Sequence, residues 1–325
     1  MSGNTSASAD LTRNNGQLGK KSFIDVIVRD FQKHKYKYLI VLPVLIFLAV
    51  FAYRPMYGLI IAFKDFRPAL GVWGSNWADP WYRHFQVWFN DPFFFRVMRN
   101  TFSLSFLNII FGFPAPIILA LLLNELRSKR FRRVVQTITY MPFFISMVVV
   151  ASLIRTFVSS GGIFSQIAVF FGGDPTNFLM HSQNFYPIFI ISDIWQFVGW
   201  NSIIFLAAIT AIDQEQYEAA TIDGATRFQQ MIRITLPNII PIISILFILR
   251  MGSILNVNFE KVLLLYNEAI FETADIISTY VYRRGIIHAN FSFGAAVGIF
   301  NSIVNVCFLL AANYISRRKT GSSLF

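Results

Sequence analysis

The chain is short of charge for its length. Of its 325 residues 14% are charged, while 55% are hydrophobic. Soluble domains usually carry about 25% charged residues. Length alone would fit about two soluble domains, but this composition excludes them and favours a protein embedded in a membrane.

The sequence also lacks the motifs of common enzymes. Its single cysteine, Cys307, lies in an apolar segment and has no second cysteine with which to form an internal disulfide. The four histidines are scattered, and neither a His-Glu-x-x-His pair nor a Gly-x-x-x-x-Gly-Lys-Ser/Thr phosphate loop occurs. We therefore expect no catalytic residue, no metal site and no cofactor in this chain. Any energy from ATP must then come through another chain.

The formal net charge of +11 comes from basic residues that flank apolar stretches, not from a soluble basic domain. This distribution argues against nucleic acid as a partner, because Lys and Arg beside spans set membrane topology. Seventeen of the 28 basic residues fall on the side that holds both termini and the loop 213–237. The positive-inside rule makes that side cytoplasmic.

Long apolar stretches dominate the rest of the sequence. A helix needs about 20 apolar residues to cross a hydrocarbon core of about 30 Å. Six stretches are long enough, and they predict spans at 38–63, 97–123, 136–158, 186–211, 238–259 and 291–316. The expected fold is an all-α membrane protein with six transmembrane helices.

The segments between and around these spans divide the chain further. Residues 1–19 are rich in Ser, Asn and Gly, which predicts a disordered tail and no cleavable signal peptide. Residues 20–37 form a basic amphipathic segment on the cytoplasmic side. The first span and an aromatic outer loop follow at 38–96, a helical core at 97–317 and a cytoplasmic tail at 318–325.

One cytoplasmic loop is polar and strongly specified. Its signals are Asp213 with Gln216, Asp223-Gly224, Thr226 with Gln229, and Pro237. The two Asp/Thr–Gln pairs fit capping boxes at helix starts, and the Asp-Gly pair is a turn signal. Glycine also permits a backbone angle that other residues resist. A connector needs only a few residues, so this loop of about two dozen predicts a helix–turn–helix that serves as a docking surface.

The spacing within this loop resembles that of a known family. Glu218, Ala219, Ala220, Gly224, Ile234, Leu236 and Pro237 match the "EAA" loop of permease subunits in binding-protein-dependent ABC importers. Further matches are Asn100-Thr101, the string from Met141 to Ser146, and the string from Tyr57 to Phe66. The last string resembles the polysaccharide and oligosaccharide branch, and the chain as a whole is similar to permeases of alginate importers.

The resemblance implies a type I permease fold in a bacterial cytoplasmic (inner) membrane, with a coupling helix between helices four and five. The implied ATPase-coupling residues are Glu218, Ala219, Ala220, Asp223, Gly224, Ile234, Leu236 and Pro237. The implied partners are a second permease (related, not identical), two ATPases that hold ATP and magnesium, an extracytoplasmic solute-binding protein and membrane lipid. The implied cargo is an acidic, alginate-like oligo- or polysaccharide.

Ionisable residues inside spans are costly, so each suggests either pairing or function. At a rise of about 1.5 Å per residue, Arg155 and Asp193 lie at matching depths in spans three and four. We expect a structural ion pair between them in preference to a substrate role. Arg250 in span five has no acidic residue at its own depth. It meets a partner subunit's carboxylate or faces a wet cavity that admits an anionic substrate, and both alternatives stay open.

Other side chains in the spans suit a sugar pathway. Span four carries Trp195, Gln196, Trp200 and Asn201, which combine flat apolar faces with amides, a chemistry that fits pyranose rings. Span six carries Asn301 and Asn305, which can bond another helix or sugar hydroxyls. The same face holds Gly294-x-x-x-Gly298, and this spacing favours close helix packing.

Two other classes of function compete with a permease. A membrane-embedded enzyme of sugar or lipid metabolism needs convergent acidic residues or a metal site at one face, and the sequence shows neither. An ion-coupled secondary transporter usually has repeated halves with interrupted helices, and no such repeat is visible. Co-purification with an ATPase distinguishes a permease from both.

Overall fold

The computed structural model describes residues 23–321 and 323–324, which form helices joined by loops. Six helical stretches are long and apolar enough to cross a membrane: Lys33–Phe63, Phe94–Glu125, Met147–Phe170, Ser182–Thr210, Arg227–Met251 and Phe291–Thr320. The prediction of six spans is confirmed. The expected disordered tail at 1–19 lies outside the described residues.

The chain divides into two compact units, with the boundary in the sequence between Leu59 and Ile60. In the first unit, α1 (Phe23–Leu48) leaves helical geometry at His34, where φ is −120°. A π-helical turn (Ala49–Tyr53) and α2 (Arg54–Met56) follow. The break at His34 lies close to the expected border between the amphipathic segment and the first span.

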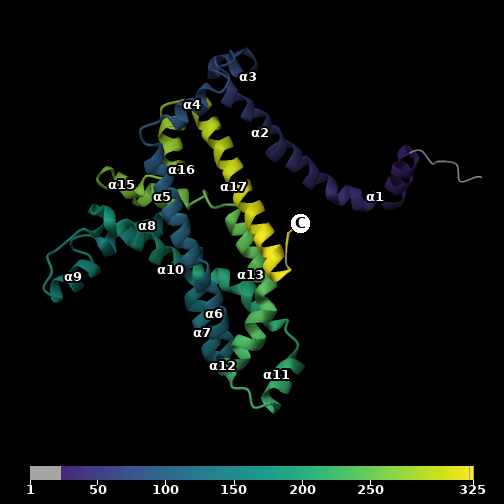
Figure 1. Cartoon of the computed structure of the whole chain (residues 1–325), viewed down its shortest axis with the longest axis vertical. Coiled ribbons are helices and arrows are strands. Elements are labelled where there is room, and N and C mark those ends of the chain that lie inside the picture. The colour runs from purple at the N-terminus through teal and green to yellow at the C-terminus, as the bar shows by residue number, and fades with distance from the viewer. Residues whose placement is uncertain (1–22, 322, 325) are drawn as a thin grey trace, which may run out of the picture. The chain divides into compact units, whose positions relative to one another are not determined.

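The second unit contains the remaining helices. They are α3 (Gly71–Gly74), α4 (Arg83–Phe89), α5 (Phe94–Leu107), α6 (Pro114–Glu125), α7 (Lys129–Tyr140), α8 (Met147–Val158), α9 (Ile163–Phe170), α10 (Phe185–Thr210), α11 (Gln214–Ile222), α12 (Arg227–Gln230), α13 (Leu236–Met251), α14 (Phe259–Leu265), α15 (Phe271–Ala274), α16 (Ile277–Val281) and α17 (Phe291–Thr320). Within this unit α11 lies at one end, and α4 and α16 lie at the opposite end (Figure 1).

The long helices of the second unit pack in pairs. A π-helical turn at Asn108–Gly112 joins α5 to α6, α6 packs along α10, and α13 packs along α17 (Figure 1). Buried apolar side chains form three clusters: one around Phe185 and Phe189, one around Trp88 and Phe293, and one around Phe205 and Ile239. These clusters hold the helices that surround the site described below.

The third and fifth spans begin and end elsewhere than expected. The predicted third span at 136–158 combines the end of α7, a break at 141–146 and α8, because Pro142 lies in a 3₁₀ turn and Ser146 caps α8. The predicted end of span five at Phe259 is wrong. The helix ends at Met251, and Phe259 instead begins α14.

Span five also begins earlier than its proline indicated. Pro237 does not mark its entry, since α12, a π-helical turn (Met231–Thr235) and α13 follow one another without a break. Leu236, just before the proline, has helical angles of −62° and −47°. Residues before proline usually avoid this conformation, and here a π-helical turn directly precedes Leu236.

The outer loops are more tightly built than their composition indicated. Trp88 of α4 is fully buried against Phe94 and Phe293, whereas Trp73, Trp77 and Trp81 are exposed. The segment between Met251 and Phe291 folds into α14, α15, α16 and a further π-helical turn. Residues at the start of this segment, among them Ser253 and Asn258, line the cavity described next.

Candidate functional site

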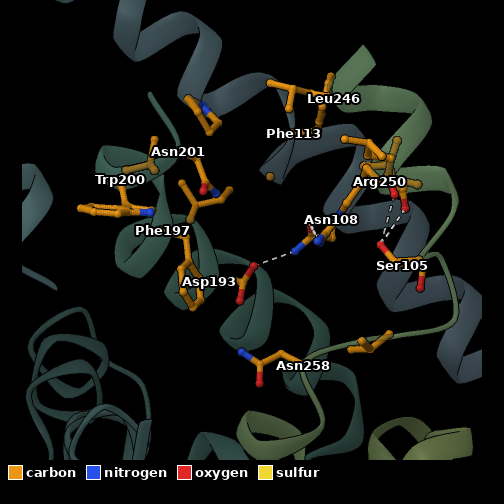
Figure 2. A pocket seen from close by; sticks show the side chains of 18 of the residues that line it. Ser105, Asn108, Phe113, Asp193, Phe197, Trp200, Asn201, Leu246, Arg250 and Asn258 are labelled. Atoms are coloured by element: carbon orange, nitrogen blue, oxygen red, sulfur yellow. Dashed lines mark hydrogen bonds between the residues drawn. The ribbon is translucent and has the colours of Figure 1, made fainter. Parts of the chain in front are cut away.

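A cavity of about 1030 Å³ lies among α5, α6, α10, α13 and the loop that follows α13. Most of its wall is apolar or aromatic. Its polar wall residues include Ser105, Asn108, Asn201 and Asn258, and its ionisable ones are Asp193 and Arg250 (Figure 2). Concave apolar sites with a few convergent polar groups are the usual form of ligand sites.

A chain of polar contacts crosses this cavity. The Arg250 guanidinium donates from Nη2 to Asn108 Oδ1 at 2.6 Å. The same amide donates from Nδ2 to Asp193 Oδ2 at 2.7 Å, as Figure 2 shows. The other oxygen of Asp193, Oδ1, lies 3.4 Å from Lys261 Nζ. Asn108 therefore joins Arg250 of α13 to Asp193 of α10.

The expected ion pair between Arg155 and Asp193 is wrong. Asp193 pairs with Lys261, and Arg155 is exposed on α8. Counting residues along a helix gives depth but not direction, so two residues at one depth need not face each other. Lys261 lies in α14, which follows the fifth span and returns to meet α10.

Asn108 occupies its place because of the local backbone. It begins the π-helical turn at Asn108–Gly112, and such turns are frequent at functional sites because they redirect side chains. A methyl group on Gly112 would lie 2.9 Å from Asn108 Oδ1 and 3.3 Å from its Nδ2. Glycine at 112 thus leaves the space in which the amide sits.

Lys261 is the most deeply buried charge at the site. Its side chain is fully buried, donates to the Phe189 carbonyl at 3.2 Å and lies over the Phe189 ring. Burial lowers the pKa of Lys261 from 10.5 to about 8, although Asp193 opposes this shift. The ammonium is therefore still mostly protonated at neutral pH, and it neutralises Asp193.

The predicted sugar-pathway residues divide into two groups. Trp200 and Asn201 line the cavity together with Arg250, and Trp200 stacks on Phe143 with ring centroids 4.3 Å apart. Trp195 is exposed and does not line the cavity. Gln196 is buried, and its Oε1 has no hydrogen-bond partner among the described residues.

The two asparagines of span six lie outside the cavity lining. Asn305 is buried, and its Oδ1 accepts a hydrogen bond from the Leu255 backbone N–H at 3.0 Å. It thereby holds the loop after α13 against α17, which is a structural contact. Asn301 is half-buried, and its Oδ1 is without a partner in the part of the chain that the structure describes.

The loop 213–237 contains the predicted helix–turn–helix, but the capping box expected at Asp213 and Gln216 does not form, and only the one at Thr226 and Gln229 does. Asp213 caps α11 by accepting from the Glu215 N–H, and Thr226 and Gln229 form a complete capping box at α12. Gly224 has a φ of +78°, the left-handed conformation that favours glycine. Glu218 is exposed, and Ile222 is 87% exposed. A well-capped turn thus displays an apolar side chain beside an acidic one.

Asn108 and Lys261 are the site residues that sequence reasoning missed. Asn108 is an amide inside an apolar span, and buried amides need hydrogen-bond partners. A comparison of depths that is limited to charged residues does not include it. Lys261 carried no signal, because its approach to Asp193 depends on the path of the chain after α13.

Comparison with known proteins places the chain among transport proteins. The family described as "binding-protein-dependent transport system inner membrane component" matches residues 112–321. Protein LplB of Bacillus subtilis is 43% identical over 90% of this chain and 92% of its own length. The polygalacturonan/rhamnogalacturonan transport system permease protein YteP of the same organism is 44% identical over 88% of this chain and 89% of its own.

Solved structures agree with this placement. The chain is similar to a bacterial ABC transporter involved in the import of the acidic polysaccharide alginate, with a TM-score of 0.82 and 44% identity. The match covers 91% of this chain and 99% of that one. A second structure, of a bacterial alginate ABC transporter in complex with an alginate pentasaccharide-bound periplasmic protein, gives a TM-score of 0.83 at 43% identity, with the same coverage.

Sequence, fold and comparisons therefore lead to one assignment. The six spans, the helix–turn–helix between the fourth and fifth of them, and the family match over 112–321 agree. The chain belongs to the binding-protein-dependent transport system inner membrane components, as a multi-pass permease subunit of type I ABC importer fold, and it is a transport subunit and not an enzyme.

Proposed function

We propose that this permease forms, with a second and related permease, the pathway for an acidic oligosaccharide that a solute-binding protein delivers. Two ATPase subunits on the cytoplasmic side, which hold ATP and magnesium, would drive the transport. The observation that carries this proposal is the exposure of Arg250 and Asn201 on the wall of a large cavity inside the membrane spans.

The exposed polar wall supports a second permease. Arg250 and Asn201 are exposed in the single chain although both lie in membrane spans. A charged side chain in contact with lipid at such a position costs at least about 2.5 kcal/mol. The cost disappears if another protein covers the cavity and keeps it wet. A partner permease that presents a similar wall would do so.

The chemistry of the wall supports an acidic sugar. The Trp200 ring offers a flat apolar face, while Asn201 and Asn108 offer amides for hydroxyl groups. The guanidinium of Arg250 carries a charge and a planar set of donors that fit a carboxylate. A neutral sugar would gain little from that charge. The relatives named for polygalacturonan and alginate transport both handle sugar acids.

The helix–turn–helix supports coupling to an ATPase. Glu218, Ile222 and Phe228 of α11 and α12 are exposed. These two helices lie at one end of the unit, opposite α4 and α16 (Figure 1). We assign this end to the cytoplasm of a bacterial inner membrane, with both termini on the same side, because most Lys and Arg residues fall there. The proposed coupling residues are Glu218, Ala219, Ala220, Asp223, Gly224, Ile234, Leu236 and Pro237.

ATPase activity of the complex purified with its native partners tests this proposal. The complex is placed in lipid nanodiscs with its binding protein and with either a uronic acid oligosaccharide or a neutral one of equal length. We expect the acidic sugar to stimulate hydrolysis several-fold more than the neutral one. Greater stimulation by the neutral sugar would refute the cargo class, and uptake that follows an ion gradient without ATP would refute ATP-driven import.

A further inference from the structure

The net charge at the cavity wall differs from the sum of the charges on its lining residues. Asp193 and Arg250 are the two ionisable residues among the lining side chains, and their charges are opposite. Taken alone they would give a wall with no net charge. Such a wall would have no electrostatic preference for an anionic cargo.

Lys261 changes this balance from behind the wall. Its side chain is fully buried, does not line the cavity, and lies 3.4 Å from Asp193 Oδ1. With Asp193 neutralised by this ammonium, the charge of Arg250 is the net charge that the chain presents to the cavity. The three groups together carry one positive charge.

Asn108 keeps the guanidinium of Arg250 apart from the carboxylate of Asp193. Its amide accepts from Arg250 Nη2 and donates to Asp193 Oδ2, so it fills the space between guanidinium and carboxylate. A carboxylate that lost Lys261 would still be joined to Arg250 through this one side chain. It would then repel an incoming anion and attract Arg250 away from it.

The geometry points to Lys261 as the residue that sets the charge of the cavity: by neutralising Asp193 it leaves Arg250 free to bind the anionic group of the cargo. Lys261 is thus a positioning residue for specificity that touches no cargo itself. This inference rests on the proposed function, because it concerns the acidic sugar that the cavity would admit.

Three variants test the role of Lys261: Lys261→Met, Lys261→Arg and the double variant Lys261→Met/Asp193→Asn. The measured quantity is the ratio of ATPase stimulation by the acidic sugar to stimulation by the neutral sugar of equal length. Lys261→Met should lower this ratio about tenfold, as expected for one charge contact in a partly screened site. The double variant should restore most of it, because Arg250 again carries the net charge.

A purely structural role gives a different pattern. Lys261→Met leaves Asp193 buried without its partner, which lowers stability, so the yield and melting temperature of each complex are measured as well. Lys261→Arg should keep the wild-type ratio. An unchanged ratio in Lys261→Met overturns the inference, and so does an equal loss of both stimulations or a double variant that stays low.

The outcome for the wild-type complex separates this inference from the proposal beneath it. Should the acidic sugar fail to stimulate the wild-type complex, the proposed cargo is wrong and the role of Lys261 falls with it. A wild-type complex that prefers the acidic sugar while Lys261→Met keeps that preference leaves the proposed cargo standing and overturns the role of Lys261 alone.

Discussion

The side chain of Asn108 forms hydrogen bonds with two groups of opposite charge. The amide oxygen accepts from a cation and the amide nitrogen donates to an anion, and the π-helical turn aims both. No charged residue could replace it, since aspartate would repel Asp193 and lysine would repel Arg250. Leucine would fill a similar volume but satisfy neither neighbour.

We expect Asn108→Leu to weaken stimulation by the acidic sugar at least about tenfold, because it removes hydrogen bonds to two charged groups. Gly112→Ala should act in the same direction, because the added methyl would lie 2.9 Å from Asn108 Oδ1 and displace the amide. The ATPase assay with acidic and neutral sugars measures both variants. Gly161→Ala is the matched control, since its added methyl meets no atom within 4 Å. Wild-type stimulation in Gly112→Ala would show that the amide does not matter.

The lowered pKa of Lys261 predicts a pH dependence of cargo preference. In the folded protein the ammonium loses its proton as pH rises through about 8, and Asp193 then loses the cation that neutralises it. The ratio of acidic to neutral stimulation should therefore fall between pH 7 and 9. The double variant Lys261→Met/Asp193→Asn should show no such fall. A wild-type ratio that stays constant across this range contradicts the prediction.

Loss of folding would not explain this fall. The unfolded chain holds the Lys261 proton up to about pH 10.5, so above pH 8 the unfolded state binds more protons than the folded state. Stability contributed by this group then rises with pH. A measured melting temperature that does not fall between pH 7 and 9 would separate the change in preference from unfolding.

At this scale the sequence predicted locations better than partners. Trp200 and Asn201 were expected on a sugar pathway, and Arg250 was expected to meet a partner's carboxylate or to face a wet cavity. All three line the cavity, and their roles stay predictions. Asp193 was expected to be paired, which is right, but its partner is Lys261 and not Arg155. A partner depends on where two elements meet in space, and helix depth alone does not contain that information.

The helix–turn–helix at Gln214–Gln230 is the element in which local signals and structure agree most fully. Caps at Asp213 and Thr226 satisfy N–H groups that a helix start leaves open, and Gly224 supplies the left-handed turn between them. Every one of these signals acts within a few residues, so the sequence alone was enough to predict the element.

Span ends were less predictable because they depend on tertiary contacts. Ile254, Leu255 and Val257 follow Met251, yet the helix ends there and Asn305 of α17 accepts from the Leu255 N–H instead. Hydropathy counts apolar residues and cannot register this contact. Hydropathy likewise gives no signal for the π-helical turn before Pro237.

We expect Gly224→Val to abolish substrate-stimulated ATPase while the complex remains in the membrane. A β-branched residue at a φ of +78° costs about 1–2 kcal/mol, which would spoil the turn that presents α11 to the ATPase. Glu218→Lys should weaken coupling as well by reversing a contact charge. The measurement is stimulated ATPase together with the yield of the assembled complex.

Gly172→Val is the matched control for this substitution. Gly172 also has a positive φ, of +87°, and its added side chain meets no atom within 4 Å, but it lies in the loop after α9. Its variant should carry a similar backbone strain and keep its coupling. Normal coupling in Gly224→Val, or equal losses in both variants, would remove the special role of the cytoplasmic turn.

At the scale of the whole molecule, the single chain is an incomplete enclosure. At most 33% of the residues in any span's most apolar stretch are buried within the chain, so lipid or protein must cover the remainder. Lipid can cover the apolar part of that surface. It cannot cover Arg250, Asn201 and Arg155, which are exposed within the spans, without the cost of placing polar groups in hydrocarbon.

The small-residue face of span six is only partly available to a partner. Gly294 already packs on Gly285 of the same chain, where an added methyl would lie 3.4 Å from the Gly285 Cα, whereas Gly298 has open space beside it. The closure of the cavity therefore depends more on the polar walls of α10 and α13 than on this glycine pair.

We expect the intact complex to contain two permease chains, this one and a related one, together with two ATPase chains. The reason is the open cavity: its cation and amides need a second wall to keep them wet and apart from lipid. Native mass spectrometry of the complex released from nanodiscs gives the stoichiometry directly.

Arg250→Gln serves as the comparison, since removing the charge should leave assembly intact if the cavity is wet. A mass with one permease per assembly would contradict the prediction, and loss of the second permease in Arg250→Gln would mean that Arg250 pairs with a carboxylate of that partner and does not face the cargo.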